Sequence, residues 1–102
     1  MVYRIKPKTV KKLLRRTGTK IGFVRFVKVD GRVRNMWFHG KIPRWMLNGN
    51  GLPYDPDEHH ITAVRDVELP KDDCIRMVPW DRILFLSINH NHYYLRNRKG
   101  FI

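Results

Sequence analysis

The strongest constraint on the fold is a pair of alternating segments joined by Asp30-Gly31. Residues 22–29 and 32–38 are rich in aromatic and β-branched residues and alternate between apolar and polar side chains, which is typical of β-strands. Asp-Gly between two such segments is the strongest short-range signal for a hairpin turn. The sequence therefore predicts an antiparallel β-hairpin in the first half of the chain.

A two-residue turn sets the register of this hairpin and places Val27 opposite Arg34. Three arginines then share one face, with two aromatic residues farther along it: Arg25, Arg32 and Arg34, with Phe23 and Phe38. Cations beside aromatic rings on a sheet can hold phosphates and stack bases. The alternative is a core hairpin whose arginines point into bulk solvent, and a one-residue slip would change the grouping.

The second half of the chain contains more strand patterns, separated by turns. Composition and turn residues predict strands over residues 61–68, 74–78, 83–88 and 92–96. A tight corner over residues 79–82 precedes the third of these strands. The segment between the two halves, residues 40–60, is punctuated by Gly and Pro and is predicted to be a long loop.

A short helix is predicted before the first strand. Thr9 is a good N-cap and Gly18 a good C-terminal stop, which predicts a helix over residues 10–16. At helical spacing three apolar residues turn inward and four cations stay in water. The apolar residues are Val10, Leu13 and Leu14, and the cations are Lys11, Lys12, Arg15 and Arg16. Two helical turns are marginal alone, so this helix must pack on the rest of the chain.

These elements predict a mainly β fold, a small, partly open barrel of the SH3 or Sm type with five or six strands and a short N-terminal helix. A length of 102 residues suits one domain, residues 1–102. We expect a basic N-terminal helix segment, then the barrel with its long loop, then a basic tail. The basic helix segment is predicted over residues 1–20, the barrel over residues 21–96 with its long loop at 40–60, and the basic tail over residues 97–102.

The positive charge of the chain is large and uneven. The formal net charge is +12. Residues 1–48 contain 14 Lys and Arg residues and one acidic residue, which gives a net charge of +13. Residues 49–102 contain 7 Lys and Arg residues and 8 acidic residues, which gives a net charge of −1. Such segregation produces a positive field over part of the surface. It predicts a polyanionic partner, which is nucleic acid first and an acidic protein second.

The chain shows no long apolar run and no signal-peptide core, so neither a membrane span nor secretion is expected. Its lone cysteine, Cys74, rules out an internal disulfide and fits a reducing compartment. We therefore expect a cytoplasmic protein without a membrane partner.

Residues 24–36, with the Asp30-Gly31 turn, resemble the opening hairpin of a family of short tailed-phage proteins with an SH3-like β-barrel. Residues within 61–89 resemble its closing part, in which an aspartate-containing strand leads to a second aspartate before the last long strand. The resemblance implies the barrel, a phage-type origin and the host cytoplasm. The family has no established catalytic residues, so the resemblance implies none here.

No catalytic, cofactor or metal site is predicted. The chain has no glycine-rich phosphate loop and no nucleophile elbow. His90-Asn91-His92 lacks the spacing of a metal-dependent nuclease site. Asp66 and Glu68 alternate along a predicted strand, the kind of spacing that a Mg²⁺ site uses, but most other acids occupy turn contexts. We therefore expect a protein that is not an enzyme and carries no cofactor or metal.

The function predicted from these features is nucleic-acid binding through phosphate contacts that are mostly independent of sequence. The candidate contact residues are Lys11, Lys12, Arg15, Arg16, Arg25, Lys28, Arg32, Arg34, Arg44 and Trp45. Candidate stacking residues are Phe26, Trp37, Trp45, Tyr93 and Tyr94. The alternative is a protein-interaction module that binds an acidic host protein or belongs to a virion. DNA and RNA stay open as ligands, and a homo-oligomer stays open as the assembly.

Overall fold

The computed structural model describes residues 2–42, 58–70 and 73–95. In those ranges it contains seven strands, one α-helix and one 3-10 turn, so a mainly β fold with a short N-terminal helix is confirmed. The elements are β1 (Val2–Ile5), α1 (Pro7–Arg16), β2 (Gly22–Val27), β3 (Val33–His39), β4 (Ile61–Asp66), β5 (Ile75–Pro79), η2 (Trp80–Arg82), β6 (Ile83–Ile88) and β7 (Asn91–Leu95). Residues 43–57 of the predicted loop, with Arg44 and Trp45, and the predicted tail lie outside the described residues.

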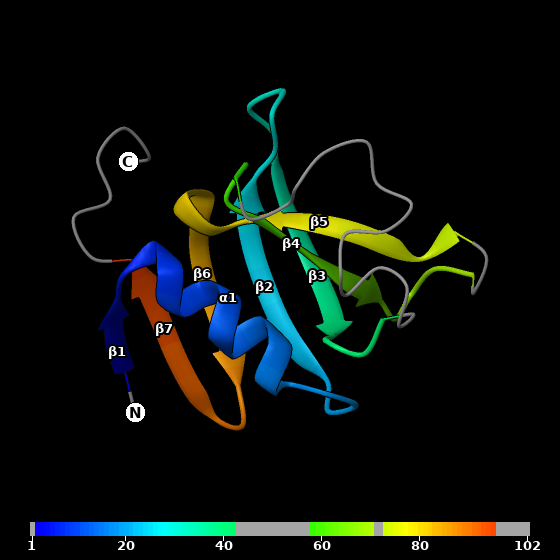
Figure 1. Ribbon diagram of the computed structural model, residues 1–102, viewed down its shortest axis with the longest axis horizontal. Coiled ribbons are helices and arrows are strands. Elements are labelled where there is room, and N and C mark those ends of the chain that lie inside the picture. The colour runs from blue at the N-terminus through cyan, green and yellow to red at the C-terminus, as the bar shows by residue number, and fades with distance from the viewer. Residues whose placement is uncertain (1, 43–57, 71–72, 96–102) are drawn as a thin grey trace.

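All seven strands belong to one sheet, in the order β1-β7-β6-β2-β3-β4-β5. β1 runs parallel to β7, and the other neighbouring strands are antiparallel. The sheet is strongly bent (Figure 1). It is not closed, because β1 and β5 form its two edges. The structure has more strands than the five or six predicted. β1 was missed because it is a short, mostly exposed segment without a buried face, which leaves no periodic signal to detect.

The helix starts three residues earlier than predicted. Its N-cap is Lys6, and Pro7 occupies the first helical turn, where a residue without an N–H is well suited. Thr9 therefore lies inside the helix, and its backbone N–H bonds to the Lys6 carbonyl at 3.0 Å, so the prediction of Thr9 as the N-cap is wrong. The predicted stop is confirmed, because Gly18 follows the C-cap Thr17 with a φ of +56°.

One side of α1 packs on the inner face of the sheet, as expected. Val10 and Leu14 are fully buried in the main core with Val24 of β2 and Leu86 of β6, and Leu13 packs partly against the same core. In Figure 1 the helix crosses in front of β7, β6 and β2. No helix in the described part of the chain is long and apolar enough to span a membrane.

The β2–β3 hairpin is confirmed, but its register is one residue away from the prediction. Val27 pairs with Val33, the residue before its predicted partner Arg34. The reason is a three-residue turn in place of a two-residue one. The Lys28 N–H bonds to the Arg32 carbonyl at 2.8 Å, and Gly31 takes a φ of +89° between them.

This register separates the arginines that were predicted to share a face. Arg34 lies on the inner face of the sheet and Arg25 on the outer face. Arg32 directly follows the turn and lies outside β3, which begins at Val33. Phe23 lies on the outer face with Arg25, whereas Phe38 is fully buried in the core. The prediction that three arginines share one face is therefore wrong. One added turn residue shifts the pairing by one position, which reverses the side chains of β3 that share a face with a given residue of β2.

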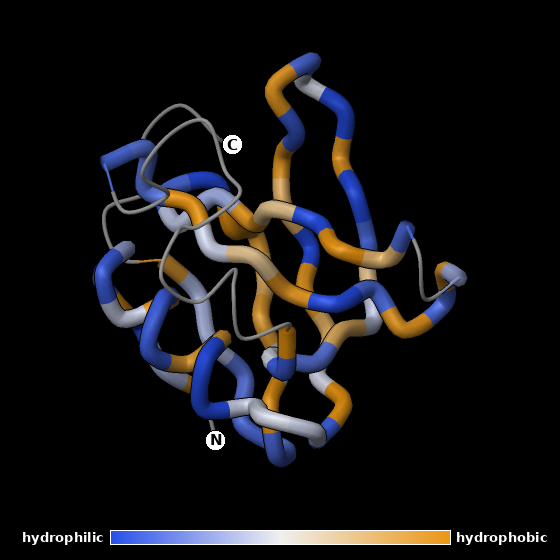
Figure 2. Tube along the Cα trace, turned by 45° about the vertical axis from the view of Figure 1, so that its right-hand side comes forward, coloured by the Kyte–Doolittle hydropathy of each residue, from blue (hydrophilic) through white to orange (hydrophobic). Residues whose placement is uncertain are grey.

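The corner before β6 is confirmed as η2, and β6 has the predicted bounds. A bulge interrupts the pairing of β2 with β6 between Arg25 and Phe26. Because of this bulge, Ile83 and Leu86 are both buried although they are three residues apart. Figure 2 shows the alternation of hydrophobic and hydrophilic residues along the hairpin that reaches away from the rest of the molecule.

Candidate nucleic-acid interface

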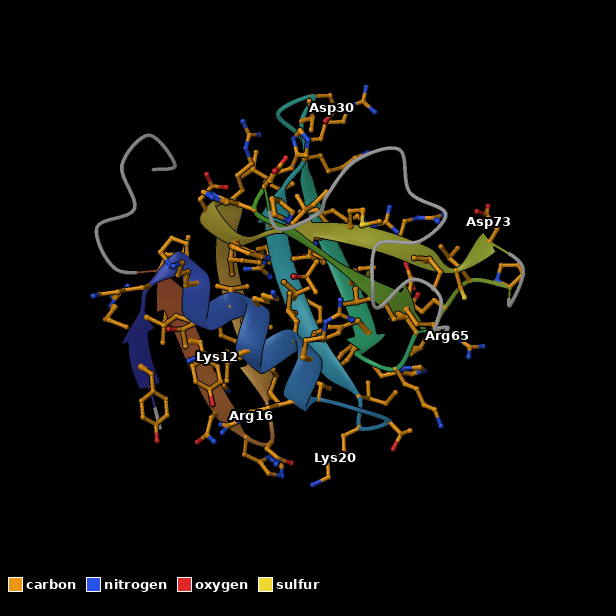
Figure 3. All side chains as sticks on the ribbon, in the orientation of Figure 1. Lys12, Arg16, Lys20, Asp30, Arg65 and Asp73 are labelled. Atoms are coloured by element: carbon orange, nitrogen blue, oxygen red, sulfur yellow. The ribbon has the colours of Figure 1, made fainter. Side chains whose placement is uncertain are left out.

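One side of α1 carries five cations and no acid. The five recur at spacings of three and four residues, so they lie on one side of the helix over an arc of roughly 140° at about 100° per residue. We call this surface the α1 cationic face; it consists of Lys8, Lys11, Lys12, Arg15 and Arg16. The apolar side of the helix lies in the core, so this face is directed away from it. Lys12 and Arg16 are labelled along it in Figure 3.

The α1 cationic face borders a depression of about 660 Å³ whose other wall is aromatic. The His60 and Trp80 rings stack there, with centroids 5.3 Å apart and planes 5° from parallel. Lys11 Nζ lies 5.8 Å from the centroid of the Trp80 ring. Trp80 is nearly fully buried, and its Nε1 donates to Thr62 Oγ1 at 2.7 Å, which fixes the indole in place. A positive wall thus faces a rigid ring surface.

The cations at the N-terminus of α1 destabilise the helix. The N-cap is Lys6 and the first turn contains Lys8 but no acid. Cations at a helix N-terminus are repelled by the helix macrodipole, and no side-chain hydrogen bond caps the first turn. Helix stability therefore does not account for Lys6 and Lys8, whereas Arg15 and Arg16 lie in the last turn, where the macrodipole favours cations. Their arrangement suits an anionic ligand, which would compensate the charges of the helix N-terminus and of the cationic face together.

The predicted contact residues at the hairpin tip lie elsewhere and are paired with an acid. Asp30 Oδ2 is 3.8 Å from Lys28 Nζ and 4.0 Å from Arg32 Nε. These are long, exposed pairs of small energetic value. In Figure 3, Asp30 marks the end of the molecule opposite Arg16. The structure therefore does not gather the predicted helix and hairpin cations into one surface.

The two remaining hairpin cations also make specific contacts. Arg34 Nη2 lies 2.7 Å from Asp66 Oδ2, and the Asp66 side chain is almost completely buried. Arg34 is thus an internal partner of an acid, and its prediction as a phosphate contact is not supported by its placement. Arg25 Nε donates to Asn35 Oδ1 at 2.7 Å on the exposed outer face. Arg25 is therefore still accessible to a ligand of that face.

The predicted stacking residues also lie in different places. Phe26 is buried in the core, so it is wrong as a stacking surface. Trp37 is 49% exposed on the outer face of the sheet. Tyr93 stacks on Tyr3 at 5.3 Å between centroids and packs partly against the core, whereas Tyr94 is on the other face of β7.

Three residues of the α1 depression were not among the predicted contacts. Lys8 was missed because the helix was expected to start later, although Pro7 is a recognisable first-turn residue. His60 and Trp80 carry no local signal. They come together because Ile61 pairs with Pro79 at the ends of β4 and β5.

The described residues contain no group of three or more His, Cys, Asp or Glu side chains placed to hold a metal ion. Asp66 and Glu68 do not form a pair on one strand face, because β4 ends at Asp66. Asp66 Oδ1 instead accepts the backbone N–H of Glu68 at 3.0 Å. Asp66 is therefore engaged in local structure as well as with Arg34.

No protein-family model matches this chain, and neither a curated protein nor a solved structure matches it.

Proposed function

We propose that this is a non-catalytic nucleic-acid-binding protein whose α1 cationic face contacts the phosphate backbone. The observation that carries the proposal is the meeting of five cations around one 660 Å³ depression, on a helix without a single acid. Lys and Arg that neutralise phosphates release condensed counterions, which is the main source of sequence-independent affinity.

The dimensions of α1 suit a stretch of backbone. Ten residues at 1.5 Å each give a helix about 15 Å long. One strand of a nucleic acid carries a phosphate every ~3.4 Å along its axis, so the face, about 12 Å from Lys8 to Arg16, is as long as three or four phosphates. Phosphate contacts position a ligand without reading its bases. We therefore expect weak dependence on sequence.

The type of barrel, the origin and the cellular location that the sequence predicts are part of the same proposal. We propose a partly open barrel of the SH3 or Sm type, with support from the η2 corner between β5 and β6 and from the strongly bent, open sheet. A phage origin and a cytoplasmic location are proposed on the resemblance and on the lone Cys74.

A matched pair of double variants tests the role of α1. K12A/R16A removes two exposed cations of the α1 cationic face, and K28A/R32A removes two at the hairpin tip, so both lower the formal charge from +12 to +10. Binding of labelled single- and double-stranded DNA and RNA is titrated over a range of salt concentrations. We expect K12A/R16A to weaken binding and to reduce the slope of log K against log salt by about 2.

The hairpin-tip variant should bind nearly as the wild type does. Equal losses in the two variants would show that net charge alone drives binding and would refute a specific role for α1. Wild-type binding that barely changes with salt would refute the phosphate-contact proposal as a whole.

A second candidate function is protein interaction, as the sequence also suggested. The observation in its favour is an apolar groove of about 660 Å³ between the hairpin tip and the β4–β5 strands. Phe26, Met77 and Pro79 supply apolar lining, and Lys28 and Arg76 supply cations. Such a groove suits an acidic segment of a partner protein that carries an apolar anchor. Retention of a host protein after nuclease treatment, lost on Met77→Asp, would favour this function.

A further inference from the structure

The outer face of the sheet carries a continuous row of aromatic rings. We call it the outer aromatic row; its members are Trp37, Phe23, Phe85, His92 and Tyr94. Centroids of rings in contact lie 4.9 Å apart for Phe23 and Trp37 and 6.2 Å apart for Phe23 and Phe85. His92 and Tyr94 lie 5.2 and 5.4 Å from Phe85. The row thus crosses β3, β2, β6 and β7.

This row is on the side of the sheet that α1 does not cover. Phe23 and Phe85 alternate with Val24 and Leu86, which are buried beneath the helix. Trp37 is half exposed at one end of the row. A depression of about 600 Å³ lies over this part of the sheet, lined by Phe23, Trp37, Phe85 and His92 together with Ser87 and His90. Four of the five rings of the row therefore line an open groove instead of filling a core.

The same face is positively charged. Arg25 lies directly opposite Phe85 in the β2–β6 pair, and the Arg4 guanidinium lies 5.0 Å from the centroid of the Tyr94 ring. The five strands that form the face, β1, β7, β6, β2 and β3, contain no Asp or Glu. An aromatic surface with cations and no acids is complementary to bases joined by phosphates. It is poorly complementary to a second copy of itself, because the two positive faces would repel.

We infer that the outer aromatic row is a stacking platform for unpaired bases of a single-stranded nucleic acid, with Arg4 and Arg25 contacting its phosphates. Every base has a π-face, so stacking on a row of rings tolerates many sequences. Bases inside a duplex already stack on one another and cannot lie on the row. This inference rests on the proposed function in that the ligand is a nucleic acid, but its site is on the opposite side of the sheet from α1.

The test replaces Trp37 at the exposed end of the row. W37L removes the ring and keeps an apolar side chain, W37F keeps a ring, and V33A is a control at an exposed position on the same face of β3. Each variant, with K12A/R16A, is titrated with homopyrimidine single strands of DNA and of RNA and with duplexes of the same length. Tryptophan fluorescence and thermal melting are recorded for each protein.

We expect W37L to bind single strands about tenfold more weakly and to bind duplexes as the wild type does. W37F and V33A should stay close to the wild type, and single strands should quench tryptophan fluorescence less in W37L. Unequal losses on the DNA and RNA strands would show which backbone the platform prefers. A tenfold loss with an unchanged melting temperature supports the inference, and the retained binding of W37F guards against a folding effect.

Unchanged single-strand binding in W37L would overturn this inference, and a loss in K12A/R16A would then leave the proposed function standing. Weaker single-strand binding in W37L with no effect of K12A/R16A would support the platform and overturn the role of α1. Self-association that W37L abolishes, without nucleic-acid binding, would assign the face to a second copy of this chain and overturn the inference.

Discussion

Arg34 of β3 and Asp66 of β4 form a 2.7 Å ion pair on the inner side of the sheet, with the Asp66 side chain 7% exposed. The two strands pair directly at Phe38–Asp66 and His39–Arg65. This short ladder joins the β2–β3 hairpin to the β4–β5 hairpin, and the ion pair reinforces it. Arg34 therefore acts within the fold, which explains why a residue that looks like a phosphate contact points inward.

Replacing Arg34 with Met should destabilise the protein by about 2 kcal/mol, because it leaves the buried Asp66 carboxylate without its partner. The loss is smaller than the roughly 3–5 kcal/mol of a fully buried pair, since the Arg34 side chain is 31% exposed. Urea unfolding measures it. The control is R76M, which removes an exposed 3.5 Å pair with Asp73 and should cost less than about 1 kcal/mol. Equal losses in the two variants would contradict a special role for Arg34.

The fold was largely predictable where local patterns determine it. Alternation located the strands around Asp30-Gly31, and helical spacing grouped Lys11, Lys12, Arg15 and Arg16 correctly on one side of α1. The hairpin register was wrong because it depends on whether the turn has two or three residues, a difference of small energy. β1 could not be found because its parallel pairing with β7 is a long-range contact.

The sites were less predictable than the fold because they join distant segments. His60 and Trp80 meet through strand pairing, twenty positions apart in the chain. The outer aromatic row requires the spatial order β7-β6-β2-β3, which is not the order of the strands in the sequence. Without that order, the sequence indicates only that Phe23 and Phe85 are strand residues, and not that their rings are in contact.

The cap of α1 supplies a second prediction, which follows from the corrected helix start. If Thr9 were the N-cap, T9A would cost about 1 kcal/mol. Because Thr9 lies inside the helix, T9A should instead be neutral or stabilise by up to about 0.5 kcal/mol. K6S should stabilise by about 0.5–1 kcal/mol, since Lys6 is an N-cap without a side-chain hydrogen bond. Thermal and urea unfolding measure both; a clear loss in T9A would contradict the structure of this terminus.

His39 supplies a prediction on pH. Burial, then the nearby charges of Arg65 and Lys41, lower the pKa of His39 below its ordinary 6.5. As the pH falls below 6.5, His39 therefore binds a proton more readily in the unfolded chain than in the folded protein. The contribution of His39 to stability is complete above that pH and is lost as the pH falls toward the lower, folded-state pKa.

The free energy of unfolding should thus be lower at about pH 5 than at about pH 7.5, and H39Q should reduce this difference. R65M should raise the pKa of His39, as read from the imidazole signals in an NMR titration, because it removes one of the two repelling charges. A pKa of His39 at or above 6.5 in the wild type would contradict the prediction.

Gly40 supplies the last prediction, because it packs directly against the backbone of α1. Its N–H donates to the Gly18 carbonyl at 2.9 Å, and an added Cβ would overlap with the carbonyl oxygen of Leu14. G40A must therefore push the helix away from the end of β3, and we expect a loss of about 2–3 kcal/mol in urea unfolding. G31A is the matched control, because a Cβ at Gly31 meets nothing within 4 Å.

G31A should lower the free energy of unfolding by about 1 kcal/mol, only because Gly31 has a left-handed φ of +89°. The two variants should also differ in function. G40A displaces the helix that carries the α1 cationic face, so it should weaken the binding of single strands and duplexes together at a temperature where the protein is still folded. G31A, at the hairpin tip, should bind as the wild type does. A G40A variant as stable as G31A would show that α1 does not rest on Gly40.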